Sequence, residues 1–182
     1  PEASPTTSPV WDIIKARRSD RRFSDKALPM SDLSALLAST RGPGRLLSRG
    51  IVWRFVANRV EGLEQGLYRY HPDSHSITQE REGDLANEAY EVAFSQDVIG
   101  QAAVAFIGSI DRRYLFSDHG ARGYRHAFLE VGMMSERLLL ATIDRKLHAC
   151  PVGAFFDDGA AKLIGSDMEK EWVLHFIGLG VP

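Results

Sequence analysis

The sequence predicts an α+β fold, because helical and strand-like segments intermix without the regular strand–helix–strand rhythm of a parallel sheet. Residues 51–57 (IVWRFVA) are rich in β-branched and aromatic side chains, which is typical of a strand. Residues 66–80 alternate in polarity on both sides of a turn at Pro72–Ser74, so they predict a β-hairpin. Residues 102–110 (AAVAFIGSI) form a continuous apolar run, as expected of a strand buried on both faces.

The remaining elements are placed by periodicity and by breaking residues. Apolar residues recur at helical spacing in 10–19, 28–40, 84–94, 121–146 and 157–165. Ser31 is the expected N-cap of the second helix, and Gly165 closes the last. The longest helix, 121–146, is expected to bury a face that includes Phe128, Leu129, Leu138, Leu139, Ala141 and Ile143. Residues 148–155 and 171–180 complete the predicted strands.

The composition is that of an ordinary globular domain. The chain has 182 residues, 44% of them apolar and 25% charged, with a formal net charge of -2. This predicts one domain over 10–182, preceded by a disordered tail at 1–9 that is rich in Pro, Ser and Thr. The near-neutral charge argues against nucleic-acid binding, and no apolar run or leader predicts a membrane protein. The single cysteine, Cys150, excludes an internal disulfide and a multi-cysteine zinc site, and fits a reducing cytoplasm.

The stretch ARRSDRRF, residues 16–23, gathers positive charge in an otherwise slightly acidic chain. In an extended segment Arg17, Ser19 and Arg21 would project to one side, and guanidinium and hydroxyl donors suit phosphate oxygens. The alternative is a solvated basic surface. The sequence shows no P-loop, Rossmann glycine fingerprint, nucleophile elbow or histidine-rich metal motif. An enzyme with none of these often depends on an organic cofactor, and no metal site is predicted.

The segment IIKARRSDRRFSDKALPMSDLSALL resembles the N-terminal motif of the nitroreductase family of flavoproteins. In that family a helix ends in Arg-x-Ser-x-Arg/Lys-x-Phe, and its basic residues and serine contact flavin mononucleotide (FMN). The resemblance implies that Arg17, Ser19 and Arg21 bind FMN, with Arg18 close by, whereas Arg22 is expected to be solvated.

Three further segments resemble the branch of this family that contains azoline dehydrogenases. They are GLYRYHPDSHSI, GARGYRHAFLEVGMMSERLLLA and HACPVGAFFDDGAAKLIG, and they occur in the family's order. The last precedes a loop that lies against the flavin ring in the family. The matching positions here are Pro151, Val152, Gly153 and Ala154. Small residues in this loop would allow close approach of backbone N–H groups to the flavin.

Two departures from that branch concern the substrate side of the site. A PSAGALYP-like segment is missing between the second helix and the first strand, so one wall is absent or comes from a partner chain. Arg41, Arg45 and Arg49 in this shortened loop are replacement contacts or solvated residues. The branch's Lys-Tyr pair is matched by Asp118 and His119, which leaves His119 as the predicted base or an exposed loop histidine. Tyr124 is a hydrogen-bond donor in the site or a core aromatic.

The compact chain and these departures resemble the larger subunit of a cyclic dipeptide oxidase of the albonoursin synthase type. The resemblance implies a mainly antiparallel sheet flanked by helices, an intertwined dimer or larger assembly, and a small second subunit. It also implies FMN-dependent introduction of Cα–Cβ double bonds into a peptide-derived substrate, with oxygen as the final acceptor. An azoline dehydrogenase, an NAD(P)H-dependent nitroreductase and a non-catalytic partner subunit are the alternatives.

Overall fold

A computed structural model describes residues 8–41, 48, 50–117 and 120–182. Six strands form one sheet in the order β3-β2-β1-β4-β6-β5, and every neighbouring pair is antiparallel. The strands are β1 (Ile51–Ala57), β2 (Gly66–His71), β3 (Ser76–Glu82), β4 (Val104–Asp111), β5 (His148–Val152) and β6 (Glu171–Gly180). The predicted α+β class with a mainly antiparallel sheet is therefore confirmed.

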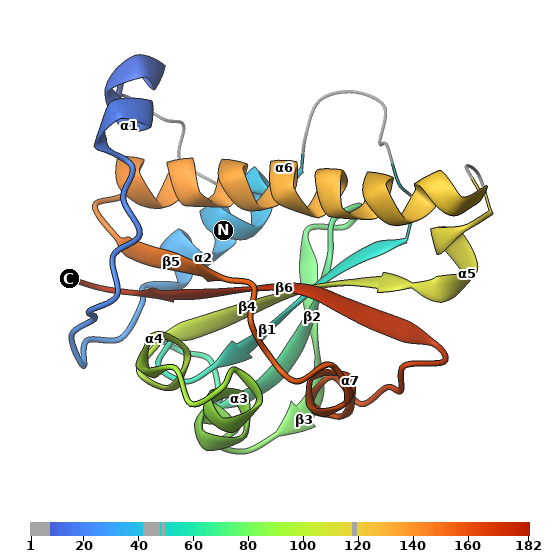
Figure 1. Ribbon diagram of the computed structural model, residues 1–182. Coiled ribbons are helices and arrows are strands. Elements are labelled where there is room, and N and C mark those ends of the chain that lie inside the picture. The colour runs from blue at the N-terminus through green and yellow to red at the C-terminus, as the bar shows by residue number, and fades with distance from the viewer. Residues whose placement is uncertain (1–7, 42–47, 49, 118–119) are drawn as a thin grey trace.

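Helices cover both faces of this sheet (Figure 1). The long helix α6 crosses one face, with α2 beside it and α1 above its C-terminal end, while α3, α4 and α7 lie against the other face. The helices are α1 (Val10–Ala16), α2 (Met30–Ser39), α3 (Ala86–Val92), α4 (Asp97–Gly100), α5 (Arg112–Leu115), α6 (Gly123–Asp144) and α7 (Asp157–Leu163), with a 3₁₀ turn, η1, at Gly120–Arg122.

Alternation along the strands divides the core into two clusters. In β1, Trp53 and Phe55 pack toward α2 and α6, whereas Val56 packs toward α3, α4 and α7. Strand β4 contributes to both clusters, because its residues from Val104 to Ile110 are all buried. The expectation of a strand buried on both faces is thereby confirmed, as is the hairpin that joins β2 and β3.

Some boundaries and faces differ from the expectations. The second helix begins at Met30 with Pro29 as its N-cap residue, so the prediction of Ser31 as N-cap was wrong. Leu138 and Leu139 are buried, but Phe128 and Leu129 are 41% and 56% exposed. On a helix these two residues lie on a different face from the buried Ala127 and Val131, so α6 carries apolar groups on two faces. The short helices α4 and α5 were not predicted, because four residues are too few to show a period.

Candidate functional site

The arginine stretch leaves regular helix at Arg17 and runs beside the edge of the sheet. The amide of Arg17 still donates to the Ile13 carbonyl at 3.0 Å and ends α1. The amide of Asp20 then donates to the Ala149 carbonyl of β5 at 3.0 Å. The His148 ring nitrogen Nδ1 donates to the Arg22 carbonyl at 2.9 Å. This stretch therefore covers the outer edge of β5, which would otherwise present unpaired backbone groups.

The same strand leads into the second predicted cofactor segment. Strand β5 ends at Val152, whose side chain is buried in the core cluster that faces α3, α4 and α7. Gly153 and Ala154 are exposed, and a Cβ placed on Gly153 would meet no atom within 4 Å. A planar ligand can therefore approach this backbone closely. Through β5 the fold brings Arg17–Arg21 and Pro151–Ala154 together, although about 130 residues separate them in sequence.

The individual cations of the stretch have different surroundings. Arg17 forms an ion pair with Glu136 of α6 at 3.5 Å, and both side chains are substantially exposed. The Arg18 guanidinium donates to the carbonyls of Lys15 and Arg17, each at 2.8 Å, and so caps the last turn of α1. Ser19 is exposed. These groups can turn to a phosphate because their present bonds are solvated and weak.

Arg21 lies beside Cys150 of β5, on the sheet face opposite the one that α6 covers. Burial raises the pKa of the Cys150 thiol, although the charge of Arg21 and a hydrogen bond from it lower that pKa in part. The Cys150 side chain belongs to the core cluster on the face that α3, α4 and α7 cover, so Arg21 lies toward that layer. Arg17 lies toward α6 instead. The expectation that Arg17 and Arg21 project to one side was therefore wrong. The two guanidiniums instead reach toward the two faces of the sheet.

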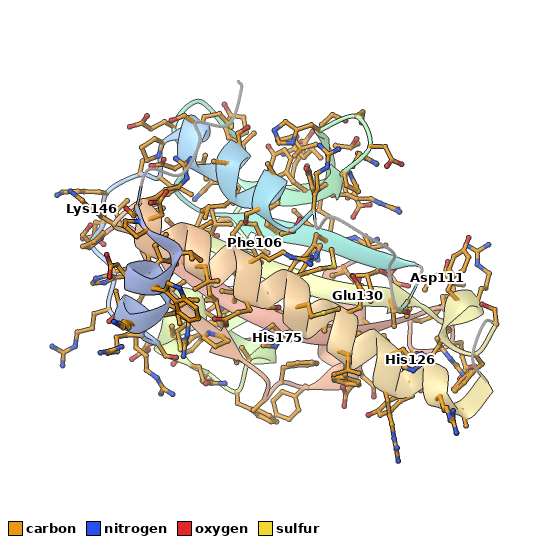
Figure 2. The ribbon with its side chains drawn as sticks, turned by 90° about the horizontal axis from the view of Figure 1, so that it is seen from above. Phe106, Asp111, His126, Glu130, Lys146 and His175 are labelled. Carbon is orange, nitrogen blue, oxygen red and sulfur yellow. The ribbon has the colours of Figure 1, made fainter. Side chains whose placement is uncertain are left out.

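Of the two predicted catalytic residues, the structure describes only Tyr124, which lies away from this segment within one chain. His119, its neighbour Asp118, Arg45 and Arg49 lie outside the described residues. Tyr124 is half exposed near the start of α6 and contacts the rings of Phe128 and Trp172, with centroids 5.0 and 6.2 Å away. Twelve residues, about 18 Å of helix, separate it from Glu136 and hence from Arg17. Figure 2 shows the length of α6, with His126 near its start and Lys146 just beyond its end.

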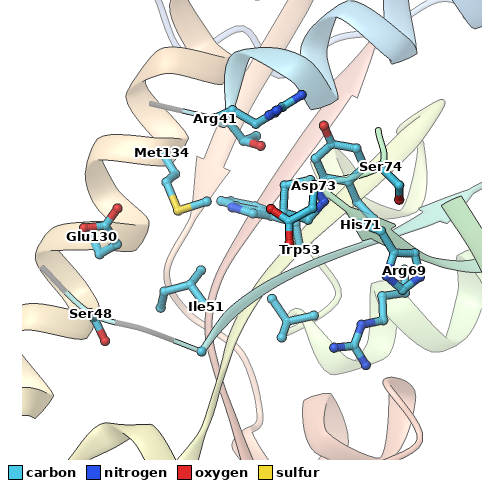
Figure 3. Close-up of a pocket in the computed structure, with 15 residues that line it drawn as sticks. Arg41, Ser48, Ile51, Trp53, Arg69, His71, Asp73, Ser74, Glu130 and Met134 are labelled. Carbon is cyan, nitrogen blue, oxygen red and sulfur yellow. The ribbon is translucent and has the colours of Figure 1, made fainter. Parts of the chain in front are cut away.

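One sizeable cavity lies away from the arginine stretch. It has a volume of about 600 Å³ and is bordered by β1, the β2–β3 hairpin, α6 and the end of α2 (Figure 3). The buried Trp53 and Glu130 line it, together with Arg41, which was expected near the site, and Arg69. None of its described lining residues belongs to either predicted cofactor segment, so its size alone does not make it the cofactor site.

A second cavity of about 570 Å³ does adjoin the predicted site. Its lining residues are Arg21, Arg22, Phe23, Gln96, Asp97, Val98 and Gln101. Arg22, which was expected to be solvated, is thus both exposed and part of a cavity wall. The side-chain amide of Gln96 donates to the Ala154 carbonyl at 3.1 Å and connects this cavity to the 151–154 loop. Gln96 lies in an irregular turn, where no sequence pattern points to it.

An antiparallel sheet with this strand order, covered by helices on both faces, defines a fold of the nitroreductase class. A profile of the Nitroreductase family matches residues 14–181, and the chain belongs to this family. It is 28% identical over 179 residues to MJ1384 of Methanocaldococcus jannaschii, named as a candidate nitroreductase; the match covers 93% of this chain and 89% of that protein.

Solved structures share the fold. A candidate nitroreductase from Anabaena variabilis superposes with a TM-score of 0.88 at 26% identity, covering 95% of this chain but 38% of its own length. This chain therefore spans well under half of that relative. The Escherichia coli microcin synthetase McbBCD complex, bound to truncated pro-MccB17, superposes with a TM-score of 0.76 at 17% identity, covering all of this chain and 75% of that one. A candidate nitroreductase from Desulfovibrio desulfuricans, solved with FMN, gives 0.69 at 16% identity, with 97% and 88% covered.

Two other features limit the kinds of site that the described residues contain. No described helix is both long and apolar enough to cross a membrane. Among the residues that the structure describes, no group of three or more His, Cys, Asp and Glu side chains is placed to hold a metal ion.

Proposed function

We propose that the chain binds FMN at the β5 edge and is an oxidoreductase of small peptide-derived molecules. The observation that carries this proposal is the hydrogen bond between Asp20 and Ala149, which joins the arginine stretch to the strand that leads into the 151–154 loop. Exposed cationic and hydroxyl groups suit a phosphate, and the open backbone at Gly153 suits a flat ring. The D. desulfuricans relative with FMN supports the same cofactor.

In this proposal Arg17, Arg18 and Ser19 hold the phosphate, and Arg21 supplies positive charge near the ring. The backbone N–H groups of Val152, Gly153 and Ala154 orient the ring edge, because hydrogen bonds from fixed donors need no reorganisation during the reaction. When bound, FMN supplies a two-electron acceptor: hydride leaves Cβ, a proton leaves Cα, and oxygen finally takes both electrons to give hydrogen peroxide. His119 is the proposed acceptor of the Cα proton.

The proposed substrate is a cyclic dipeptide, in which one Cα–Cβ bond becomes a double bond. An azoline dehydrogenase of peptide maturation is the second candidate, favoured by the similarity to the McbBCD complex. A nicotinamide-dependent nitroreductase is the third, favoured by the family and by a Vibrio harveyi NADPH:FMN oxidoreductase of the same fold, with a TM-score of 0.70 at 16% identity. A non-catalytic partner subunit would bind no flavin.

We also propose that two copies assemble through the exposed apolar residues of α1 and α6. These are Val10, Trp11, Ile14, Tyr124, Phe128, Leu129 and Met133. Helix α1 has seven residues, of which Ile13 alone is buried, and a helix this short is unstable without packing. A second copy would cover it and bring a second Tyr124 toward the site. The small second subunit implied by the resemblance would complete the assembly.

Spectra of the purified protein test the cofactor, and matched variants test its site. We expect a flavin absorbance band, and we expect Ser19→Ala combined with Arg17→Met to weaken FMN binding at least tenfold. Lys26→Met, an exposed cation beyond the stretch, is the control and should bind FMN normally. A protein without a flavin absorbance band, even when it is purified together with the proposed small second subunit, would exclude an FMN-dependent enzyme. Equal FMN affinity in all three proteins would place the phosphate elsewhere.

Mass spectrometry after incubation with cyclo(Gly-L-Phe) in air tests the reaction. The expected product is two hydrogens lighter, and His119→Asn should slow its formation at least tenfold while FMN stays bound. Turnover of a nitroaromatic compound with NADH, without change in the cyclic dipeptide, would establish the third candidate instead. Light scattering of Leu129→Glu tests the assembly: we expect a smaller particle that has lost FMN, whereas Tyr114→Glu on α5 should keep the native mass.

A further inference from the structure

The hairpin segment GLYRYHPDSHSI contains a chain of polar side chains that the proposed function does not use. The Tyr70 hydroxyl and the His75 ring nitrogen Nδ1 share a hydrogen bond at 2.9 Å. The other ring nitrogen, Nε2, shares one with the Ser34 hydroxyl of α2, also at 2.9 Å. The rings of Tyr70 and His75 meet edge to face, with centroids 5.7 Å apart. This chain joins the turn of the β2–β3 hairpin to the middle of α2.

The backbone of His75 has an unfavourable conformation that its ring contacts maintain. Its φ is 48°, in the left-handed region that non-glycine residues rarely adopt. Such conformations persist only where the surrounding structure fixes them, and they are frequent at functional sites. The bonds of the His75 ring to β2 and to α2 supply that fixation. The Tyr70 hydroxyl is therefore held both by its own strand and, through His75, by α2.

Tyr70 in turn holds Arg41, which lies just beyond the end of α2. Burial raises the pKa of the Tyr70 hydroxyl, although the charge of Arg41 and a hydrogen bond from it lower that pKa in part. Because a guanidinium can only donate, the Tyr70 oxygen accepts this bond. Tyr70 is buried and Arg41 is exposed. Contact with a fixed hydroxyl therefore restricts a side chain that would otherwise sample many rotamers.

Arg41 and Tyr70 both line the cavity of about 600 Å³ between β1, the hairpin and α6 (Figure 3). This volume is within the usual range for small-molecule sites, about 300 to 1,000 Å³. Among the described lining residues two are basic and two are acidic, namely Arg41, Arg69, Asp73 and Glu130. Arg69 also lies 3.9 Å from Glu80, and the His71 ring shares a hydrogen bond with Thr78 at 3.0 Å. Apolar surface comes from Ile51, Trp53 and Met134.

This balance of charges favours an uncharged ligand with both donors and acceptors. Two guanidiniums would attract an anion, but the carboxylates of Asp73 and Glu130 in the same walls would repel it. An amide carbonyl accepts from a guanidinium, and an amide N–H donates to a carboxylate. A compact ring of amides with an apolar substituent therefore matches the charged and the apolar walls together.

The cavity borders the surface that we assign to a second copy. Glu130 and Met134 of α6 line it, and the residues that precede them, Leu129 and Met133, are exposed members of the proposed contact. Within one chain α6 separates the cavity from the arginine stretch, because α2 and α1 lie on opposite flanks of α6 (Figure 2). A molecule in this cavity is therefore between the copies and on the far side of α6 from its own chain's flavin segment.

We propose that the cavity is the substrate pocket for the flavin of the second copy, and that Arg41 donates there to an amide carbonyl of a small cyclic peptide. Tyr70 and His75 are positioning residues, because they act on the substrate through Arg41. The inference rests on the proposed function, from which it takes the substrate class and the contact between copies.

Titration of the FMN-loaded protein with cyclo(Gly-L-Phe), followed by the flavin absorbance and by steady-state kinetics, tests the pocket. Arg41→Met should raise the Kd and the KM of the probe at least tenfold, with FMN content and the mass of the assembly unchanged. Lys162→Met is the control, because it removes an exposed cation from α7 on the other face of the sheet. It should leave both constants unchanged.

A matched pair of tyrosine variants tests the positioning role. Tyr70→Phe should raise the KM at least threefold and leave kcat unchanged. Tyr68→Phe is the control, because this buried tyrosine of the same strand also loses one hydrogen bond, to the Glu64 carbonyl at 2.9 Å. In the Arg41→Met background Tyr70→Phe should have no further effect on KM. A merely structural role of Tyr70 would lower Tm as Tyr68→Phe does and leave KM unchanged.

The outcomes separate this inference from the function on which it rests. If the wild-type protein oxidises the probe but Arg41→Met matches Lys162→Met, the cavity is not the substrate pocket although the proposed function stands. If Arg41→Met loses FMN, Arg41 belongs to the cofactor site and the inference is wrong. If Tyr70→Phe matches Tyr68→Phe, the positioning role is refuted. If FMN-loaded wild-type protein neither binds nor oxidises the probe, the proposed substrate class fails and the inference fails with it.

Discussion

Arg54 is the centre of a buried ion-pair network on the sheet face that α3, α4 and α7 cover. It lies on β1 and is 5% exposed. Its Nε donates to Glu80 of β3 at 2.6 Å, and its Nη1 donates to Glu171 of β6 at 2.6 Å. The Ser109 hydroxyl of β4 also donates to Glu171, at 2.5 Å. Burial lowers the pKa of Arg54, but the hydrogen bonds and charges of Glu171 and Glu80 raise it by more than this. The pKa of Arg54 is therefore above its ordinary value.

Replacing Arg54 by methionine leaves Glu171 without its counter-ion and leaves Glu80 with Arg69 alone, at 3.9 Å. Removal of one partner from a buried pair costs about 3 to 5 kcal/mol, chiefly because the other charge stays buried. The Glu171 side chain is 13% exposed and that of Glu80 is 26% exposed, so water can relieve part of this cost. We therefore expect the lower end, about 3 kcal/mol, of the range. For a chain of this length that corresponds to a fall in Tm of about 6 to 12 °C.

Urea denaturation followed by circular dichroism measures this loss. Arg113→Met is the matched control: Arg113 pairs with Asp111, but its side chain is 81% exposed and its loss should barely change the midpoint. In the double variant Arg54→Met, Glu171→Leu, part of the lost stability should return, because one stranded carboxylate is gone. A loss below about 1 kcal/mol for Arg54→Met, or a double variant less stable than the single one, would contradict the assignment of a buried network.

Two further predictions concern stability. Burial lowers the pKa of His175 below 6.5, so the folded protein keeps this ring neutral where the unfolded chain binds a proton. The free energy of unfolding should therefore fall as the pH drops below about 6.5, the pKa in the unfolded chain, and should level off below the pKa in the folded protein. Chemical denaturation at a series of pH values measures this curve, and His175→Gln should flatten that part of it. Gly178→Ala should destabilise the protein by about 1 to 3 kcal/mol, because its Cβ would lie 2.0 Å from the Val98 carbonyl oxygen. Gly132→Ala, where a Cβ meets nothing within 4 Å inside α6, should instead stabilise the protein by about 0.5 to 1 kcal/mol. Thermal melts of the two glycine variants measure both changes, and equal effects would contradict the packing.

Much of the fold could be predicted because its elements leave local patterns. The apolar run 102–110 and the turn at Pro72–Ser74 each determine their element within a short window, and the structure confirms both. The exposed Phe128 and Leu129 were misplaced because they are as apolar as the buried residues of α6. The spacing of apolar residues shows that a helix carries two apolar faces, but it does not show which of these faces the sheet covers.

The resemblance to the family and the two predicted cofactor segments were already visible in the sequence, because ARRSDRRF and CPVGAF are contiguous stretches. Their meeting at β5 was decided by the tertiary structure, since the bond from Asp20 to Ala149 joins positions that no local window contains. The opposite directions of Arg17 and Arg21 follow from the same cause: each guanidinium turns to a neighbour supplied by a distant element, Glu136 and Cys150. Chain order and short-range periodicity determine which elements form; packing between distant elements determines which side chains they bring together.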